Sequence, residues 1–303
     1  MYPSWMRPAP DAIRLPSDVT RAGARIEGAS RWVPLAVALT AVVALYTPIL
    51  AGMAVEWATF PSLSHGFAVP LISAYLIWRR RELINAEPLG SANVGLVVLA
   101  AALGVFQAGW LSGETFFARA SFPLALLGIT LFLAGPRVTG HAWPAIAYLL
   151  FMIPFPYLTF KAVMYQSRLV EADVTATVLR WSGVPILQQG VMLHLPSATL
   201  EIAEVCSGVH AVAALAALGT AYAQIQPRAS WVRAALALSA APLGLLSNLL
   251  RLVLTALGVH YLGPITLTSV FHQFSGTTVF LATVVLLVGL DRLLVRMARA
   301  GSR

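Results

Sequence analysis

Charged residues and cysteine are both scarce in this 303-residue chain. Only 11% of the residues are charged, about half the share of a soluble domain, whereas 58% are hydrophobic and the mean hydropathy is +0.78. This composition excludes a soluble globular protein and predicts an all-α integral membrane protein. The single cysteine, Cys206, excludes an internal disulfide framework and any cysteine-rich metal site.

Apolar runs long enough to cross a bilayer, about 20 residues each, recur along most of the chain. They are Trp32–Val55, Phe60–Trp78, Asn93–Trp110, Arg119–Gly135, His141–Tyr157, Ser207–Gln224, Val232–Leu250 and Gln273–Leu290. We therefore expect about eight transmembrane helices forming one domain over residues 32–303. Residues 1–31 are polar and rich in proline and arginine, which predicts a loosely ordered cytoplasmic tail.

The basic residues are distributed unevenly over the segments between these runs. With the N-terminus placed inside, fifteen of the 20 Lys and Arg residues fall in inside segments and five in outside segments. An excess of basic residues marks the cytoplasmic side of membrane proteins. The net charge of +8 is thus explained by topology rather than by a nucleic-acid partner, and both termini are predicted to be cytoplasmic.

The longest outside segment, residues 158–205, has its own pattern. Leu158–Trp181 carries apolar residues at helical spacing between charged ones, as in an amphipathic helix lying on the membrane. Val184–Val205 alternates apolar and polar residues, with turn residues at Gly190 and Pro196. This predicts a hairpin of two short strands that leads into Cys206, just before the sixth membrane helix.

Three residues that can cooperate in chemistry are predicted to lie at one depth. Cys206, Arg251 and His272 are each 18 to 22 residues along a span from an arginine of the inside segments, about 30 Å of helix. A thiol at the start of a helix is favoured as thiolate by the helix dipole, a histidine can act as its base, and an arginine can stabilise an oxyanion. Together they provide what acyl transfer requires.

Each of these residues also has an ordinary structural interpretation. A single buried cysteine is most often a small apolar filler, Arg251 could extend its side chain to the interface, and His272 could cap the last helix. None of the three residues would indicate catalysis if it were considered alone. Their convergence from three helices is what favours a catalytic site.

Other residues are candidates for supporting roles. His210 follows Cys206 by four positions, on the same helix face, and could be the base in place of His272. Glu204 could pair with Arg251, although a carboxylate beside a thiolate would raise the thiol pKa. Asn248 lies one turn before Arg251 and could orient it, and His65 begins the second span on the outer side.

Several of these stretches together resemble the exosortase/archaeosortase family of multi-pass membrane cysteine transpeptidases. The matching stretches are Ser64-His65-Gly66, Pro154-Phe155-Pro156, Glu204-Val205-Cys206-Ser207-Gly208-Val209, Asn248-Leu249-Leu250-Arg251 and His272-Gln273-Phe274-Ser275-Gly276. Each is a weak pattern alone, but their order and predicted topology make the resemblance to exosortases specific.

The resemblance implies that Cys206 is the nucleophile and that Arg251 and His272 complete a triad. His210 stands where relatives often carry Arg or Asn, so its role is open. The implied partners are the lipid bilayer, an acceptor of unknown identity, and membrane-anchored proteins with a C-terminal PEP-CTERM sorting signal: a Pro-Glu-Pro motif, an apolar helix and a basic tail. The implied location is the bacterial inner membrane, with the site facing the periplasm and a link to exopolysaccharide production.

Two other classes of membrane protein are alternatives to this interpretation. A transferase acting on lipid-linked sugar during exopolysaccharide export could use the same arginine and histidine on a phosphate, but would normally show carboxylates for a metal. The outer acidic residues form no tight motif beyond Glu171 and Asp173 on the surface helix. A transporter would place polar groups near mid-membrane, and little but Pro242 suggests that. No cofactor and no metal are expected.

Overall fold

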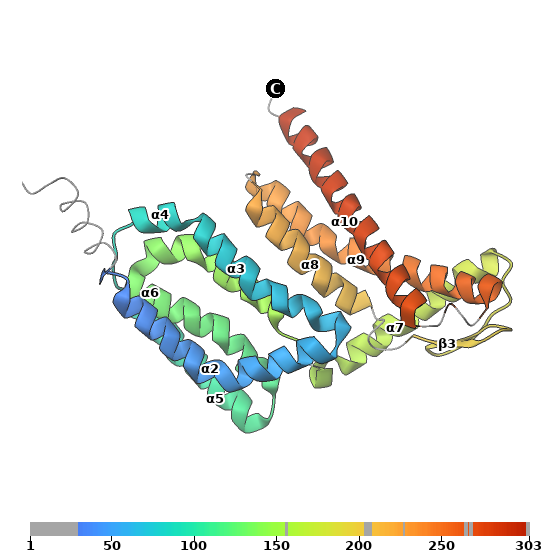
Figure 1. The fold of residues 1–303 in the computed structure, drawn as a ribbon, viewed down its shortest axis with the longest axis horizontal. Helices are drawn as coiled ribbons and strands as arrows, with labels where there is room; N and C mark the ends of the chain where they lie inside the picture. Colours follow the sequence, from blue (N-terminus) through green and yellow to red (C-terminus); the bar gives the residue numbers. More distant parts are fainter. Residues whose placement is uncertain are drawn as a thin grey trace, which may run out of the picture.

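The structure is a computed structural model that describes residues 30–154, 157–202, 208–226, 228–263, 266 and 269–300. The first part of the chain forms α2 (Val33–Thr59), η2 (Pro61–Phe67), α3 (Ala68–Arg79), α4 (Arg81–Ala86), α5 (Asn93–Ser112), α6 (Thr115–Tyr148) and η3 (Leu149–Met152). The second part forms α7 (Tyr157–Trp181), β1 (Leu187–Gln189), β2 (Met192–His194), β3 (Thr199–Glu201), α8 (Gly208–Ile225), α9 (Ser230–Leu262) and α10 (Ser269–Ala300). Figure 1 shows the two parts side by side.

Within the described residues, six helical segments are long and apolar enough to cross a membrane. They are Val33–Thr59, Asn93–Ser112, Thr115–Met152, Gly208–Ile225, Ser230–Leu262 and Gly276–Arg299. The all-α membrane fold is therefore confirmed, whereas the predicted count of eight spans is not. The second predicted span is divided between the 3-10 helix η2 and the 12-residue α3, so neither piece is long enough to count as a span.

The fourth and fifth predicted spans fall in one continuous segment, residues 115–152, whose backbone leaves helical geometry at Gly135 with φ of 85°. A positive φ is a conformation that glycine adopts at little cost. Arg119 pairs with Glu56 near the end of α2, and the adjacent Trp57 donates to the carbonyl of Met152. Because the two ends of the segment meet at one end of α2, the chain reverses at Gly135, as the two green limbs of Figure 1 show.

The first part of the chain packs around one apolar cluster, in which Tyr46, Met53 and Leu76 are almost fully buried. Helices α5 and α6 approach each other closely at Gly95, which has no Cβ. A Cβ at this position would lie 2.3 Å from the backbone nitrogen of Phe132. Such small-residue contacts let membrane helices approach each other closely. Buried hydroxyls here form hydrogen bonds between helices, for example the Tyr46 hydroxyl of α2 with Ser121 Oγ of α6 at 2.7 Å.

The last three helices form a second bundle, in which α9 contacts both α8 and α10. Its small apolar cluster includes the buried residues Leu215, Leu236 and Leu287. Helices α8 and α9 come close at Gly244, where a Cβ would lie 2.7 Å from Val212 Cα. At the far end of this bundle Asp291 on α10 accepts two hydrogen bonds from Arg228, at 2.9 and 3.1 Å.

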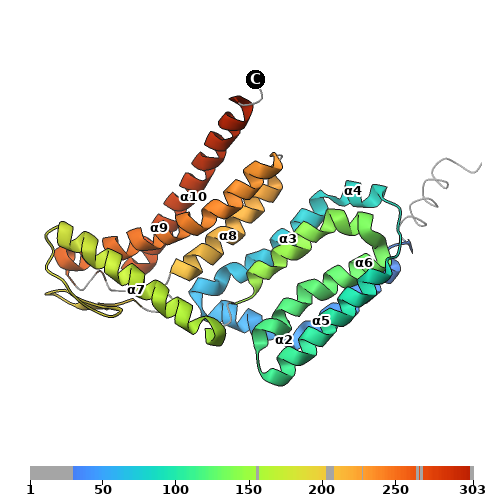
Figure 2. The ribbon, with the colours of Figure 1, turned by 180° about the vertical axis from the view of Figure 1, so that it is seen from behind.

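The second part of the chain begins with the predicted amphipathic helix, here α7, and an antiparallel sheet. The prediction of two strands was incomplete, because a third strand, β3, pairs with β2 in the order β1-β2-β3. The strands pack on α7 through a cluster that includes Ala172, Leu193 and Ile202. Figures 1 and 2 both place α7 and the sheet at the end of the bundle where α8 begins and α9 ends.

Several basic residues of the predicted inside segments gather at the opposite end of the molecule. Arg79 donates to the carbonyl of Ile225, at the end of α8, and Arg80 donates to the carbonyl of His141 at 2.9 Å. Arg31 donates to the carbonyl of Asn85, in the same region, at 2.6 Å. The arginine-rich end is therefore one physical end of the bundle. That this end faces the cytoplasm stays a prediction.

Candidate functional site

Arg251 lies on α9 against the first turns of α10. A Cβ built at Gly276 would lie 3.7 Å from Arg251 Nε and 3.8 Å from its Cζ, so the half-buried arginine side chain runs along the backbone of α10 at this glycine. His272 precedes Gly276 by four positions, and positions four apart share a face of a helix. The face of α10 that begins at His272 therefore passes Arg251.

Two predicted site residues fall outside the described residues: Cys206, the proposed nucleophile, and Glu204. The backbone of His272 belongs to α10, while its side chain is outside the described part. The catalytic roles of Cys206, Arg251 and His272 thus stay predictions. The described residues on either side of Cys206 nevertheless show how the start of α8 is held.

The start of α8 is held by Glu171 of α7. The backbone N–H of Gly208 donates to Glu171 Oε1 at 2.8 Å, and Ser167 Oγ donates to the same oxygen at 3.1 Å. Asn248 Nδ2, on α9, donates to Oε2 at 3.0 Å. One carboxylate therefore joins α7, α8 and α9, and both of its oxygens accept hydrogen bonds.

Sequence reasoning placed Glu171 on the polar face of a surface helix, which was wrong. The residue is only 7% exposed, because the start of α8 packs over it. Burial raises the pKa of Glu171, and the bonds from Gly208, Ser167 and Asn248 together with nearby Arg168 oppose that rise. The missed signal was Gly208 itself, since a Cβ there would lie 2.5 Å from Glu171 Oε1.

Asn248 was predicted to support Arg251 from one turn away on α9. The structure shows the buried Asn248 side chain donating to Glu171, so it connects α9 to the outer helix α7. Because Asn248 and Arg251 are three positions apart, this bond fixes the part of α9 that carries the arginine.

The two other supporting histidines lie in different surroundings. His210 is half-buried in the first turn of α8, two positions after Gly208. His65 belongs to η2, and its imidazole forms hydrogen bonds with the backbone of Ser62 and of Phe151. Burial lowers the pKa of His65, because a buried imidazole loses the hydration that favours its charged form. His65 is therefore held between η2 and η3, and η2 in turn contacts α8.

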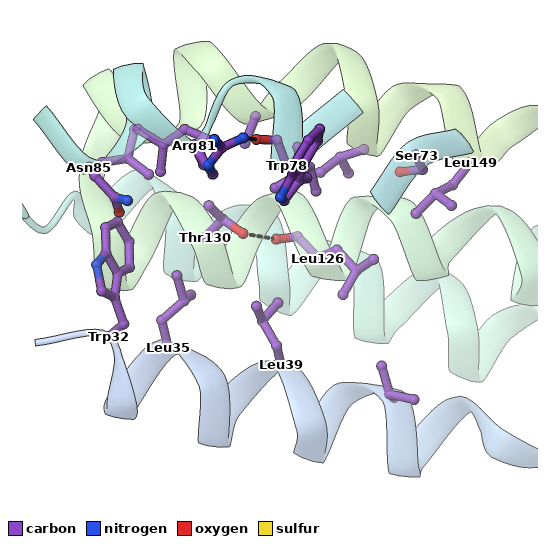
Figure 3. A pocket seen from close by; sticks show the side chains of 16 residues that line it. Trp32, Leu35, Leu39, Ser73, Trp78, Arg81, Asn85, Leu126, Thr130 and Leu149 are labelled. Carbon is purple, nitrogen blue, oxygen red and sulfur yellow. Dashed lines mark hydrogen bonds between the residues drawn. The ribbon is translucent and has the colours of Figure 1, made fainter. Parts of the chain in front are cut away.

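A separate apolar pocket lies among α2, α3, α4 and α6, away from these residues. It has a volume of about 490 Å³, and Figure 3 shows Leu35, Leu39 and Trp78 lining it. The hydroxyl of Thr130 in its wall donates to the carbonyl of Leu126 at 2.7 Å, and Ser73 donates to that of Ala145. Because these hydroxyls are already used, the pocket offers an apolar cavity rather than a reactive centre.

Comparison with families of known proteins shows one match for this chain. The family described as transmembrane exosortase matches residues 57–289, which include Glu171, Cys206, Arg251 and His272. Comparisons with curated proteins and with solved structures find no match. The family match covers most of the chain, and the helical membrane fold agrees with it. The chain therefore belongs to the transmembrane exosortase family.

Proposed function

We propose that this protein is a membrane cysteine transpeptidase that cleaves C-terminal PEP-CTERM-type sorting signals of secreted proteins at the outer face of the bacterial inner membrane. The observation that supports this most is the position of Arg251 beside the first turns of α10, the helix that begins near His272. Arg251 and the start of α10 lie at the end of the bundle where α8 begins, and this supports the proposal that Arg251 acts together with His272.

The substrate enters with its own apolar helix beside the bundle and its basic tail on the cytoplasmic side, which leaves its sorting motif near Cys206. The thiolate of Cys206 attacks the carbonyl carbon of the scissile peptide bond, and Arg251 stabilises the oxyanion that forms. His272 gives a proton to the leaving amine as the C–N bond breaks. The product of this half-reaction is a thioester between Cys206 and the secreted protein.

In the second half-reaction an amine of the acceptor attacks the thioester carbonyl. The new C–N bond forms as the C–S bond breaks, and the thiolate of Cys206 is regenerated while the histidine takes up the amine proton. With water as acceptor the same steps release a free carboxylate.

The test is processing of a co-expressed membrane-anchored reporter with a PEP-CTERM-like tail. Native protein is compared with Cys206→Ala, Arg251→Ala and His272→Ala at matched expression, and Arg180→Ala and His260→Ala serve as controls of the same residue types. We expect the first three variants to lose processing and the two controls to retain it. Processing by Cys206→Ala would contradict the proposal, and loss of activity with a chelator would favour a metal-dependent transferase on lipid-linked sugar.

A further inference from the structure

The apolar pocket of the first part of the chain extends inward from the arginine-rich end of the molecule. One of its walls is formed by four residues on one face of α2, namely Trp32, Leu35, Leu39 and Val43. The first and the last of them are 11 positions apart, so this wall is about 16 Å long at about 1.5 Å per residue. The hydrocarbon core of a bilayer is about 30 Å thick, so the pocket is about as deep as one leaflet.

Two arginines lie at the mouth of the pocket. Among the described residues that line it, Arg81 of α4 is the only charged one. Arg31 reaches the same place, because its Nη2 donates at 2.6 Å to the carbonyl of Asn85, a lining residue one turn after Arg81. Figure 3 shows Arg81 and Asn85 at the same end of the pocket as Trp32. The mouth therefore combines two positive charges with an apolar interior.

Each of these arginines lies against a tryptophan that also lines the pocket. The Cζ atom of Arg81 is 4.4 Å from the ring centre of Trp78, and that of Arg31 is 5.1 Å from the ring centre of Trp32. Tryptophan is enriched where the hydrocarbon of a membrane meets the headgroups, and arginine side chains extend to the same level. The two pairs therefore indicate that the mouth lies at headgroup level and the rest of the pocket in the hydrocarbon.

The pocket is open at the surface of the protein. Val43, Ile77 and Trp78 line it and are nevertheless 43%, 38% and 58% exposed. Since these residues belong to α2 and α3, a flexible chain can enter from the side, between the two helices. Arg81 also pairs with Glu82 at 3.5 Å, but both side chains are largely exposed, and a pair of this kind is weak enough for a phosphate to replace it.

We propose that this pocket binds an anionic phospholipid from the leaflet at the arginine-rich end. One acyl chain occupies the cavity of about 490 Å³, and the phosphate binds the guanidinium groups of Arg31 and Arg81. The hydroxyls of Ser73 and Thr130 in the wall donate to backbone carbonyls, which leaves an apolar lining suited to hydrocarbon. The proposal does not rest on the proposed function.

Charge complementarity selects this occupant over the apolar helix of a substrate. A PEP-CTERM-type signal ends in a basic tail, which the two arginines at the mouth would repel. A phosphate carries the opposite charge and accepts paired hydrogen bonds from a guanidinium. The mouth therefore favours an anionic lipid.

The test measures lipid binding to the full-length protein in detergent by native mass spectrometry. The two probes are phosphatidylglycerol and phosphatidylcholine with identical acyl chains, so that the net charge of the headgroup is the main difference. The variants at the mouth are Arg31→Gln, Arg81→Gln and the double variant, and Arg296→Gln, an exposed arginine of α10, is their control. Leu35→Trp fills the pocket, and Leu45→Trp, at an exposed position of the same helix, is its control.

The native chain is expected to bind phosphatidylglycerol about tenfold or more tightly than phosphatidylcholine. Each single variant at the mouth should weaken the binding of phosphatidylglycerol about fivefold, and the double variant about 25-fold, as is typical of arginines beside an anionic headgroup. The affinity for phosphatidylcholine should not change, and Arg296→Gln should bind both lipids like the native chain. Leu35→Trp should lose both lipids, whereas Leu45→Trp should retain them.

Three results would overturn the proposal: equal affinity of the native chain for the two lipids, an equal loss in Arg296→Gln, or native-like binding by Leu35→Trp. Release of phosphatidylglycerol by a synthetic peptide with the apolar helix and basic tail of the reporter would also overturn it, because the pocket would then belong to the substrate.

Where a variant does not fold, the native chain decides the question. Phosphatidylglycerol with a photoreactive acyl chain is crosslinked to the native protein, and the labelled peptides are identified by mass spectrometry. We expect labels within residues 35–43 of α2 and 126–149 of α6, and labels confined to other parts of the chain would overturn the proposal.

Discussion

Two regions of the molecule, one from each part of the chain, are stabilised internally in different ways. The part formed by α2 to η3 packs around one large apolar cluster, with glycine contacts between α5 and α6 and with hydroxyls bonded to nearby carbonyls. The part formed by α7, the sheet and the start of α8 has small apolar clusters and is joined by buried charged side chains, above all Glu171. Apolar packing stabilises the first region as a whole. In the second region, buried charged side chains bind particular backbone groups, such as the N–H of Gly208 and the carbonyl of Ile202.

Because of this difference, we expect substitutions in the two regions to affect stability and activity differently. Substitutions around Glu171 and Arg251 are expected to reduce processing by each folded molecule, whether or not they also reduce stability. Substitutions in the α5–α6 contact are expected to reduce stability while each folded molecule stays active. Four substitutions test this contrast.

The largest effect is expected for Arg251→Lys. A lysine keeps the positive charge but loses the planar guanidinium that lies along α10 at Gly276. We expect kcat/KM for the reporter to fall by about 10²-fold or more, as for loss of an oxyanion donor, with little change in thermal stability. Arg180→Lys, at the exposed end of α7, is the matched control. Native-like activity of Arg251→Lys would show that only its charge matters.

Gly208→Ala is expected to affect both activity and stability. The new Cβ would lie 2.5 Å from Glu171 Oε1, so the carboxylate or the start of α8 must move. We expect a loss of about 1–3 kcal/mol in stability, typical of overpacking, and a clear loss of processing per folded molecule. Gly219→Ala on the same helix, where the nearest atom is 3.6 Å away, should be tolerated. Equal behaviour of the two variants would contradict the role of this contact.

Gly95→Ala should destabilise the scaffold without reducing the activity of each folded molecule. Its Cβ would lie 2.3 Å from the backbone nitrogen of Phe132, so α5 and α6 must separate, at a cost of about 1–3 kcal/mol. Gly104→Ala is the control on α5, because nothing lies within 4 Å of its Cβ position. Thermal unfolding in detergent and reporter processing normalised to folded protein measure the two effects. A selective loss of specific activity would remove the contrast between the parts.

The smallest effect is expected in the pH dependence of stability. Burial raises the pKa of Glu171 above its ordinary value of 4.5, so the folded state holds this proton more tightly than the unfolded state. The resulting contribution to stability is complete below pH 4.5 and is lost as the pH rises through the folded-state pKa. Glu171→Gln lacks this term, so its stability relative to the native chain should improve as the pH is raised. A constant difference in Tm from pH 4.5 to 8 would contradict this.

Much of the scaffold could be predicted from the sequence because bilayer crossing imposes long apolar runs. The first and third predicted spans match α2 and α5 closely, and the amphipathic pattern of 158–181 predicted α7. The reversal at Gly135 was also expected from the loop between two runs. The division of the second predicted span into η2 and α3 was not expected. Apolar composition alone does not distinguish a 3-10 helix from an α-helix.

The site was less predictable because it depends on contacts between distant residues. Glu171 meets Gly208 and Asn248, which are 37 and 77 positions away in the chain. Helical periodicity shows that a face of α7 is polar but does not show what covers that face. Equal spacing from the arginines predicts one depth for Cys206, Arg251 and His272, and this stays a prediction. The structure shows Arg251 beside Gly276 of α10.

The proposed mechanism requires Cys206 to form a thioester with the secreted protein. The most direct test adds hydroxylamine as acceptor during reporter processing and identifies the new C-terminus of the product by mass spectrometry. We expect a hydroxamate on the reporter with the native chain and none with Cys206→Ala, together with a covalent adduct that maps to Cys206. Hydroxamate formed by Cys206→Ala, or an adduct that maps to another residue, would contradict it.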